Sequence, residues 1–295
     1  MADGGAQRFT DLGTEAYWRR HFPKLSIGQR LTPALRDRIL TRRARDDEIA
    51  LLDERMAVDG YIQGRDNTLA KNAPLLAAAV KTCKALEVPP TFLFVFDEVW
   101  ECFYSLNAML SHFLGDYRLL PDFWVWHVDP SLEEAGWAPH RDKGRVSLGP
   151  DGRPLSLTVW VPLSVATPLT SCMYVLPKGR DPVYGTEQEY EFQIDPPAVR
   201  ALPGGPGDWF CWNQALLHWG SISSRFADQP RISMALELQR ADVKPFNQPL
   251  LPPFSSLDFP SRLLLIAKQI LQYRHMYRVH PDIEAYAQSI LRKSA

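Results

Sequence analysis

Residues 155–161 read LSLTVWV and residues 123–128 read FWVWHV, and these two stretches decide the fold class. Both consist largely of β-branched and aromatic residues and are bounded by Asp-Pro, Gly-Pro and Asp-Gly turn signals, which is typical of strands. Short antiparallel strands that follow one another closely are typical of a jelly roll or a β-sandwich. We therefore expect a mainly β core. Four further strands are expected at residues 173–176, 190–194, 209–212 and 232–238.

The sequence on both sides of this region predicts helices. Thr32 and Pro33 supply an N-cap and a proline at the first helical position, so residues 33–58 are expected to form one or two surface helices. Between residues 97 and 114 apolar side chains recur every three or four residues, which predicts a helix with a core-facing stripe. The last 35 residues also have a helical pattern. We divide the chain into an N-terminal helical extension (1–47), a jelly-roll domain (48–244) and a C-terminal linker and helical tail packed on the same domain (245–295).

Composition limits the classes of function. The chain has 295 residues, of which 45% are hydrophobic, so it can bury a sizeable core. Its net charge of −1 argues against a nucleic-acid binder, which usually carries a basic excess. No stretch approaches the roughly 18 apolar residues of a membrane-spanning helix, and the N-terminus resembles neither a secretory signal nor a transit peptide. Its four widely spaced cysteines are expected to be free thiols. We expect a cytoplasmic protein whose partner is a small molecule; the sequence does not determine its oligomeric state.

Four residues point to metal-dependent oxidation: His140, Asp142, His218 and Arg231. Two imidazoles and one carboxylate form the facial triad that binds Fe(II) and leaves three coordination positions open. Residues i and i+2 of a strand point to the same side, so His140 and Asp142 can reach one ion together. Arg231 is suited to bind the second carboxylate of a dicarboxylate co-substrate. We expect His218 and Arg231 to lie on neighbouring strands of a hairpin.

The residues leave two alternatives open. His127 and Asp129 form a second His-x-Asp pair, and a single pair of this kind is a weak signal. Arg225 is closer to His218 than Arg231 is, although it lies in a polar stretch where a loop is more natural. Arg231 is also compatible with a solvated surface position.

Taken in order, these features resemble the phytanoyl-CoA dioxygenase-like group of Fe(II)/2-oxoglutarate-dependent oxygenases. The resemblance covers about residues 55–240 and favours His140 and Asp142 over His127 and Asp129, because the strand at 155–161 follows His140 at the family's distance. It departs from the pattern at residues 177–180, which lack the family's serine and histidine, and in a slightly longer spacing from His218 to the arginine. The resemblance rests on DGY at 59–61, WAPHRD at 137–142, the strand at 157–163, MYVLPKGR at 173–180, GD at 207–208, HWGS at 218–221 and Arg231.

The resemblance implies a double-stranded β-helix and a set of roles. Fe(II) would be held by His140, Asp142 and His218, and 2-oxoglutarate would chelate the metal while Arg231 binds its distal carboxylate. O2 would be consumed, succinate and CO2 released, and an unactivated C–H bond of a small organic substrate hydroxylated. His127 and Ser221 are further candidate contacts of the co-substrate, although His127 is equally compatible with a core position.

Other reactions and functions remain open. Related halogenases have a small residue in place of the carboxylate, so Asp142 disfavours halogenation, whereas desaturation or ring formation remains compatible. The alternatives to an oxygenase are a non-catalytic jelly-roll binding or scaffold protein, and a zinc or other cupin-like metal enzyme.

The substrate is less well defined. The loop after the His-x-Asp pair is basic, so it either favours an anionic or thioester-linked substrate or is simply solvated; its basic residues are Arg141, Lys143, Arg145 and Arg153. Three tryptophans either line the cavity or pack in the core, namely Trp126, Trp160 and Trp212. The terminal helices are candidates to cap the mouth of the jelly roll.

Overall fold

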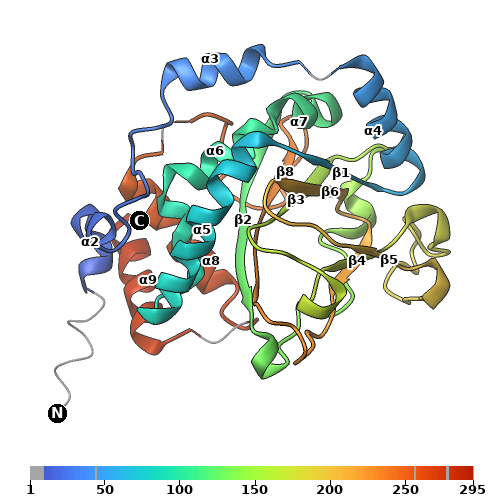
Figure 1. The fold of residues 1–295 in the computed structure, drawn as a ribbon. Helices are drawn as coiled ribbons and strands as arrows, with labels where there is room; N and C mark the ends of the chain where they lie inside the picture. Colours follow the sequence, from blue (N-terminus) through green and yellow to red (C-terminus); the bar gives the residue numbers. More distant parts are fainter. Residues whose placement is uncertain (1–9, 44, 256, 277–278, 295) are drawn as a thin grey trace.

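The computed structural model describes residues 10–43, 45–255, 257–276 and 279–294, and two antiparallel sheets lie at the centre of this part (Figure 1). The larger sheet has the strand order β1-β6-β3-β8-β2 and the smaller one β5-β4-β7. The predicted mainly β, jelly-roll core with helical additions is confirmed. The strands are β1 (Tyr61–Arg65), β2 (Tyr117–Val128), β3 (Ser156–Pro162), β4 (Met173–Leu176), β5 (Arg200–Leu202), β6 (Asp208–Asn213), β7 (Leu217–Gly220) and β8 (Arg231–Arg240).

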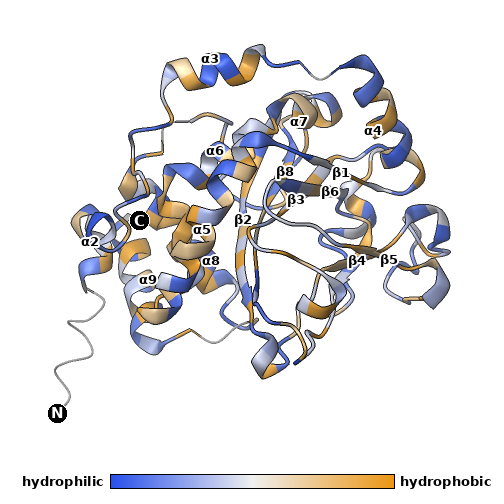
Figure 2. Cartoon of the chain, viewed as in Figure 1, coloured by the Kyte–Doolittle hydropathy of each residue, from blue (hydrophilic) through white to orange (hydrophobic). Residues whose placement is uncertain are grey.

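Helices cover the outer face of the larger sheet, on the left of Figure 1. Figure 2 shows apolar residues concentrated where α5, α6 and α8 approach β2, whereas α3 and α4 carry long hydrophilic stretches. Within the described residues, no helix is both long and apolar enough to cross a membrane. The α-helices are α2 (Glu15–His21), α3 (Pro33–Thr41), α4 (Asp46–Val58), α5 (Asn67–Ala85), α6 (Asp97–Ser105), α7 (Asn107–Leu114), α8 (Phe259–Gln272) and α9 (Pro281–Ser294).

Strand β3 shows how the larger sheet separates two apolar layers. Leu157 and Val159 point outward into the core shared with the helices, which includes Trp18 near the N-terminus and Ile266 in α8. Trp160 points inward, where it packs in a second cluster between the two sheets. Successive side chains of a strand lie on opposite faces, so a strand covered on both faces is apolar along its length. This double burial explains the mostly apolar LSLTVWV pattern, in which the polar residues Ser156 and Thr158 both lie on the inner face.

The helix predictions are confirmed in part. Thr32 caps α3, accepting a hydrogen bond from the backbone N–H of Leu35 (3.2 Å), and residues 33–58 form two helices. The chain turns into β1 at Gly60, whose φ of +80° favours glycine, and a Cβ there would lie 2.9 Å from the side-chain nitrogen of Asn213. The single helix predicted over 97–114 is two helices, α6 and α7, which meet at Leu106.

The strand predictions fail in identifiable places. Residues 173–176 coincide with β4, whereas no strand forms at 190–194, where the chain makes turns. Strands β1, β5 and β7 are not predicted; each is only three to five residues long and, unlike β4 (MYVL), contains glycine or charged residues. Runs of this length are too short to show the alternation that identifies a strand.

Candidate metal centre

Two backbone hydrogen bonds bring the histidines together. The N–H of His140 donates to the carbonyl of His218, and the N–H of His218 donates to the carbonyl of His140, both at 3.0 Å. The segment that carries His140 thus pairs with β7 as an isolated antiparallel bridge. Directly opposed residues of such a pair place their side chains on the same face. The two imidazole centroids consequently lie 4.3 Å apart.

Asp142 completes a cluster suited to a metal ion. One metal-binding atom from each of His140, Asp142 and His218 lies within 4.8 Å of the others. The Nε2 atoms of both histidines are 3.5 Å from Oδ1 of Asp142. Each Nδ1 is placed to donate to a backbone carbonyl, that of Ala138 (2.7 Å) or Leu216 (3.0 Å). With the proton on Nδ1, both Nε2 lone pairs are directed at the same point, as metal binding requires.

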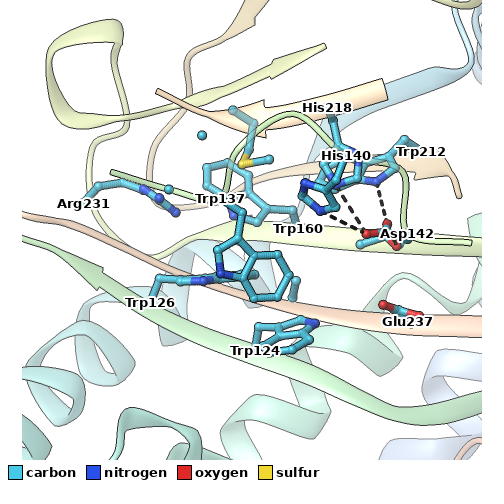
Figure 3. Close-up of a pocket in the computed structure, with 15 residues that line it drawn as sticks. Trp124, Trp126, Trp137, His140, Asp142, Trp160, Trp212, His218, Arg231 and Glu237 are labelled. Carbon is cyan, nitrogen blue, oxygen red and sulfur yellow. Dashed lines mark hydrogen bonds and ion pairs between the residues drawn. The ribbon is translucent and has the colours of Figure 1, made fainter. Parts of the chain in front are cut away.

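A second set of contacts orients the carboxylate of Asp142. Its Oδ2 accepts hydrogen bonds from Oγ1 of Thr158 (2.6 Å) and Nε1 of Trp212 (3.2 Å). The side-chain amide of Gln214 in turn donates to Thr158 at 3.0 Å. Because Oδ2 is occupied, Oδ1 is left to face the two histidines (Figure 3). Such outer contacts fix the geometry of a metal ligand.

Asp142 and His218 tend toward the protonation states that bind a metal, whereas the neighbouring Asp142 favours the protonated form of His140. Burial raises the pKa of Asp142, but the neighbouring histidines and the hydrogen bond from Thr158 outweigh burial and leave it well below its usual range. Burial lowers the pKa of His218 to about 4, so this ring is neutral at neutral pH. Burial lowers the pKa of His140 as well, but its contact with Asp142 outweighs burial and raises it. Among the described side chains, the buried Nε2 of His140 has no hydrogen-bond partner. The donor set, two imidazole nitrogens and one carboxylate oxygen, fits Fe(II).

Arg231 lies at the other end of the same cavity (Figure 3). It is 1% exposed, and its guanidinium donates to Oγ of Ser233 (2.6 Å) and lies 5.8 Å from the ring centroid of Trp160. No carboxylate of the described residues pairs with it. Burial lowers its pKa to about 10, so it is still charged at neutral pH. A buried cation without an anionic partner is costly unless a ligand supplies the anion.

Glycine makes room beside this guanidinium. A Cβ on Gly136 would lie 3.2 Å from Nη2 of Arg231 and only 2.6 Å from the Cα of Gly220. A side chain at Gly136 would therefore push the two segments apart. The cavity measures about 440 Å³, and its lining between Arg231 and the triad includes Trp160, Met173 and Ala235.

The expected hairpin of His218 and Arg231 is wrong. His218 is on β7 in the smaller sheet, and Arg231 begins β8 in the larger one. The two residues therefore face each other across the space between the sheets rather than along one sheet. Arg225, the alternative to Arg231, is exposed and lies against Phe226 (5.2 Å to the ring centroid).

The two further candidates for co-substrate contacts do not line the cavity. His127 is next to the inward-facing Trp126 on β2, so its ring lies on the other face, where Nδ1 is 3.1 Å from Nζ of Lys84. Asp129 instead accepts a hydrogen bond from the backbone N–H of Ser131, so the second His-x-Asp pair forms no metal cluster. Ser221 contributes its backbone carbonyl, which accepts from Ser171 Oγ at 2.5 Å.

The basic loop is not a free anion-binding patch. Arg141 is fully buried and pairs with Asp181 (2.7 Å), and Lys143 pairs with Glu237 (2.9 Å) inside the protein. Pairing with these buried carboxylates neutralises the charges of Arg141 and Lys143. Glu237 itself lines the cavity (Figure 3).

Residues of the site that sequence reasoning missed include Trp124, Trp137, Thr158 and Glu237. Thr158 and Glu237 each alternate with apolar residues in a strand whose outer face is covered by helices. Buried polar residues on the inner face of such a strand are the signal that identifies them. The three candidate tryptophans Trp126, Trp160 and Trp212 do line the cavity.

The chain matches no protein-family model and no curated protein. Solved structures share its fold at low identity. The non-heme monooxygenase ThoJ, in its nickel complex, is 16% identical over 76% of this chain and 97% of its own, with a TM-score of 0.55. The epimerase SnoN, solved with Fe3+, alpha ketoglutarate and nogalamycin RO, is 16% identical over 70% of this chain and 96% of its own, with a TM-score of 0.52. A second SnoN structure, described as a non-heme alpha ketoglutarate dependent epimerase from nogalamycin biosynthesis, gives 19% identity over 67% and 82%, with a TM-score of 0.51.

Proposed function

We propose that the chain is a non-haem Fe(II)/2-oxoglutarate-dependent oxygenase that oxidises a small organic substrate, by hydroxylation of an unactivated C–H bond in its simplest form. One observation carries the proposal: a His-Asp-His cluster faces a buried, unpaired arginine across one cavity. The pairing of a metal site with an internal cation suits a co-substrate that chelates metal at one end and is anionic at the other. That description fits 2-oxoglutarate.

Each residue then has a defined role. His140, Asp142 and His218 would hold Fe(II), and Arg231 would bind the distal carboxylate of 2-oxoglutarate. When bound, the metal, co-substrate and O2 would supply the oxidising chemistry, with release of succinate and CO2. The protein orients the ligands through Thr158 and Trp212 and keeps bulk water out with an apolar lining. ThoJ and SnoN, which share the fold, are described as a monooxygenase and an epimerase of this chemical class.

We place the chain among the phytanoyl-CoA dioxygenase-like oxygenases on the strength of its ordered motifs. The structure supports the central part of that resemblance, since residues 137–142, β3 and residues 218–231 all contribute to the site. We further propose one catalytic unit in which the described parts of residues 1–47 and 245–295 brace the jelly roll of 48–244, because their apolar residues share its outer core. Four buried, free cysteines support a reducing compartment such as the cytoplasm.

The test is anaerobic addition of Fe(II) and then 2-oxoglutarate to the purified protein. We expect a weak visible metal-to-ligand charge-transfer band and, after O2 is admitted, slow formation of succinate without added substrate. Asp142→Ala should abolish both signals, and Arg225→Met, an exposed control, should leave both intact. A folded protein that binds Fe(II) but shows neither band nor succinate is a binding protein or a different metal enzyme. Binding of Zn(II) with no response to 2-oxoglutarate would favour the latter.

A further inference from the structure

A second, larger groove lies next to the metal cavity. It measures about 1090 Å³, against about 440 Å³ for the metal cavity, and runs along β2, the edge strand of the larger sheet. The end of α5, the short helix η2 (Pro90–Val95) and the segment before α9 form its other sides. We call it the outer groove. Its lining includes Lys84, Val88, Pro90, Val125, His127 and Val279.

Three tryptophans separate the two spaces. Trp124, Trp126 and Trp137 line both the metal cavity and the outer groove. Trp137 meets Trp124 edge to face at 4.3 Å between centroids, and it meets Trp126 in the same way at 5.5 Å. The ring of Trp137 is also 5.5 Å from that of His140. The wall therefore stands directly beside the metal cluster.

The wall is the least enclosed part of the cavity lining. Trp126 and Trp137 are half-buried, whereas Trp160 and Trp212 are 1% and 2% exposed. Trp212 and the core residue Trp18 are also held by hydrogen bonds, from Nε1 to Oδ2 of Asp142 (3.2 Å) and to the carbonyl of Leu12 (2.9 Å). Within the described ranges, no hydrogen bond holds the indole nitrogen of Trp126 or Trp137. Ring packing alone positions this pair, so it can part without breaking a polar contact.

We propose that the outer groove binds the bulk of the substrate, a flat, ring-bearing organic acid, and that its reacting carbon reaches the metal between Trp126 and Trp137. This inference rests on the proposed function. The metal cavity must first receive a metal and a co-substrate, and its volume of about 440 Å³ already includes the open space at its mouth, so little room is left in it for a substrate. The outer groove provides that space next to the cluster.

The lining of the outer groove indicates the chemistry of its ligand. Its lining is mainly indole rings, prolines and valines, with Lys84 and Glu87 as its charged residues, and aromatic faces of this kind favour stacking with flat rings. At the rim, Nζ of Lys84 lies 3.1 Å from Nδ1 of His127, an ammonium donating to a ring nitrogen. Burial and the charge of Lys84 lower the pKa of His127, so that ring is neutral at neutral pH. The exposed ammonium retains donors for an anionic group.

The test uses 8-anilinonaphthalene-1-sulfonate, an aromatic anion with a flat naphthalene ring whose fluorescence rises on binding. It is titrated into the full chain alone and with saturating Ni(II) and 2-oxoglutarate, which fill the metal cavity without turnover. We expect one bound molecule, with a Kd that changes less than about twofold when the metal cavity is filled. Displacement of the probe by Ni(II) and 2-oxoglutarate would overturn the proposal, since it would place the probe in the metal cavity.

Matched variants locate the probe. Lys84→Glu should weaken binding about fivefold or more, because one charge pair of about 1 kcal/mol becomes a repulsion. Lys81→Glu makes the same change on an exposed face of the same helix, and it should have little effect. Val125→Trp fills the groove and should abolish binding, with circular dichroism as the check on folding. Equal effects of Lys84→Glu and Lys81→Glu would contradict the proposal even if Val125→Trp failed to fold.

The proposal about the groove and the proposed oxygenase function can be disproved independently of each other. Titration of the metal-free protein and its variants tests the groove even if the chain binds neither Fe(II) nor 2-oxoglutarate. Conversely, a charge-transfer band with 2-oxoglutarate, together with no probe binding in the groove, would leave the proposed function standing and remove this inference.

Discussion

His140 and His218 bind each other through both of their backbone amides, each N–H donating to the other's carbonyl at 3.0 Å. Their ring positions are therefore fixed by main-chain pairing before any metal is present. The pairing joins a loop to a four-residue strand, β7, and places Asp142, two residues further on, beside both rings. A cluster prepared in this way binds a metal without first ordering its ligands.

Removing one imidazole should abolish metal binding without unfolding the protein. We expect His218→Ala to weaken Fe(II) affinity by more than about 100-fold, since loss of an outer contact alone costs about 10- to 100-fold. His112→Ala is the control, because His112 lies on the surface, 2.7 Å from Asp53. Anaerobic calorimetric titration measures both, and equal affinities in the two variants would exclude the cluster as the iron site.

Arg231→Met should weaken the binding of 2-oxoglutarate without destabilising the protein. Replacing the guanidinium removes the partner of the distal carboxylate, and hydrogen bonds to charged groups contribute about 1.5–3 kcal/mol. The Kd for 2-oxoglutarate in the Ni(II)-loaded protein should therefore rise by about 10- to 100-fold.

The same variant should leave the ligand-free protein as stable as before, or more stable by about 1 kcal/mol, because Arg231 is a buried cation without an anionic partner. Urea unfolding measures this difference. Destabilisation by more than about 2 kcal/mol would show that Arg231 serves the fold.

Thr158→Val should loosen the metal site while preserving the shape of its surroundings. The valine lacks the hydroxyl that donates to Asp142 at 2.6 Å, so the carboxylate is free to turn. Metal affinity should fall by about tenfold. Thr82→Val, which removes a helix-surface hydroxyl that donates to Ala78 at 3.1 Å, is the matched control. Unchanged affinity in Thr158→Val would mean that Trp212 alone orients Asp142.

Asp97 should be a stability determinant far from the site. Its buried carboxylate pairs with Arg262 at 2.7 Å and accepts from the backbone N–H groups of Gly28, Gln29 and Arg30 at 2.7–3.0 Å. Asp97→Asn leaves Arg262 buried and unpaired, so unfolding free energy should fall by about 3 kcal/mol in urea titrations. Asp116→Asn, in an exposed pair with Arg118, should change it by less than about 1 kcal/mol.

The same residue gives a pH dependence of defined sign. Burial raises the pKa of Asp97, but the backbone donors and the charge of Arg262 outweigh burial and lower it overall. A carboxyl with a lowered folded-state pKa stabilises the protein above its unfolded pKa of about 3.9 and loses that contribution as the pH falls further. The difference in unfolding free energy between wild type and Asp97→Asn should be constant near neutral pH and shrink below about pH 4. A difference that grew on acidification would contradict this assignment.

The cysteines should be unreactive in the native protein. All four are buried, and burial raises the pKa of Cys83 to about 12 and that of Cys172 to about 11. Only the thiolate is nucleophilic, so iodoacetamide at neutral pH should leave native protein unmodified and label all four residues after unfolding. Rapid labelling of the native protein, detected by mass spectrometry, would indicate local opening around the modified cysteine.

The sequence by itself determined the β core and the identity of the residues that form the His-Asp-His cluster. Inward and outward faces of β3 are both covered, so its residues are all buried and mostly apolar, and this pattern is visible without knowledge of the fold. His140 and Asp142 are two residues apart in the sequence, and in the structure both side chains belong to the same cluster. The pairing of both with His218 followed from an ordered set of motifs.

Only the tertiary structure decided how these parts meet. Strand β7 is too short to show a pattern, so its bridge to His140 cannot be predicted from the sequence. Arg231 belongs to the larger sheet and approaches the cavity from the side opposite His218. His127 and Trp126 are neighbours in sequence, yet they lie on different faces of β2, one in the outer groove and one at the wall of the metal cavity. Pairing between distant segments sets which faces enclose the cavity, and a linear sequence records the face of a residue only within its own strand.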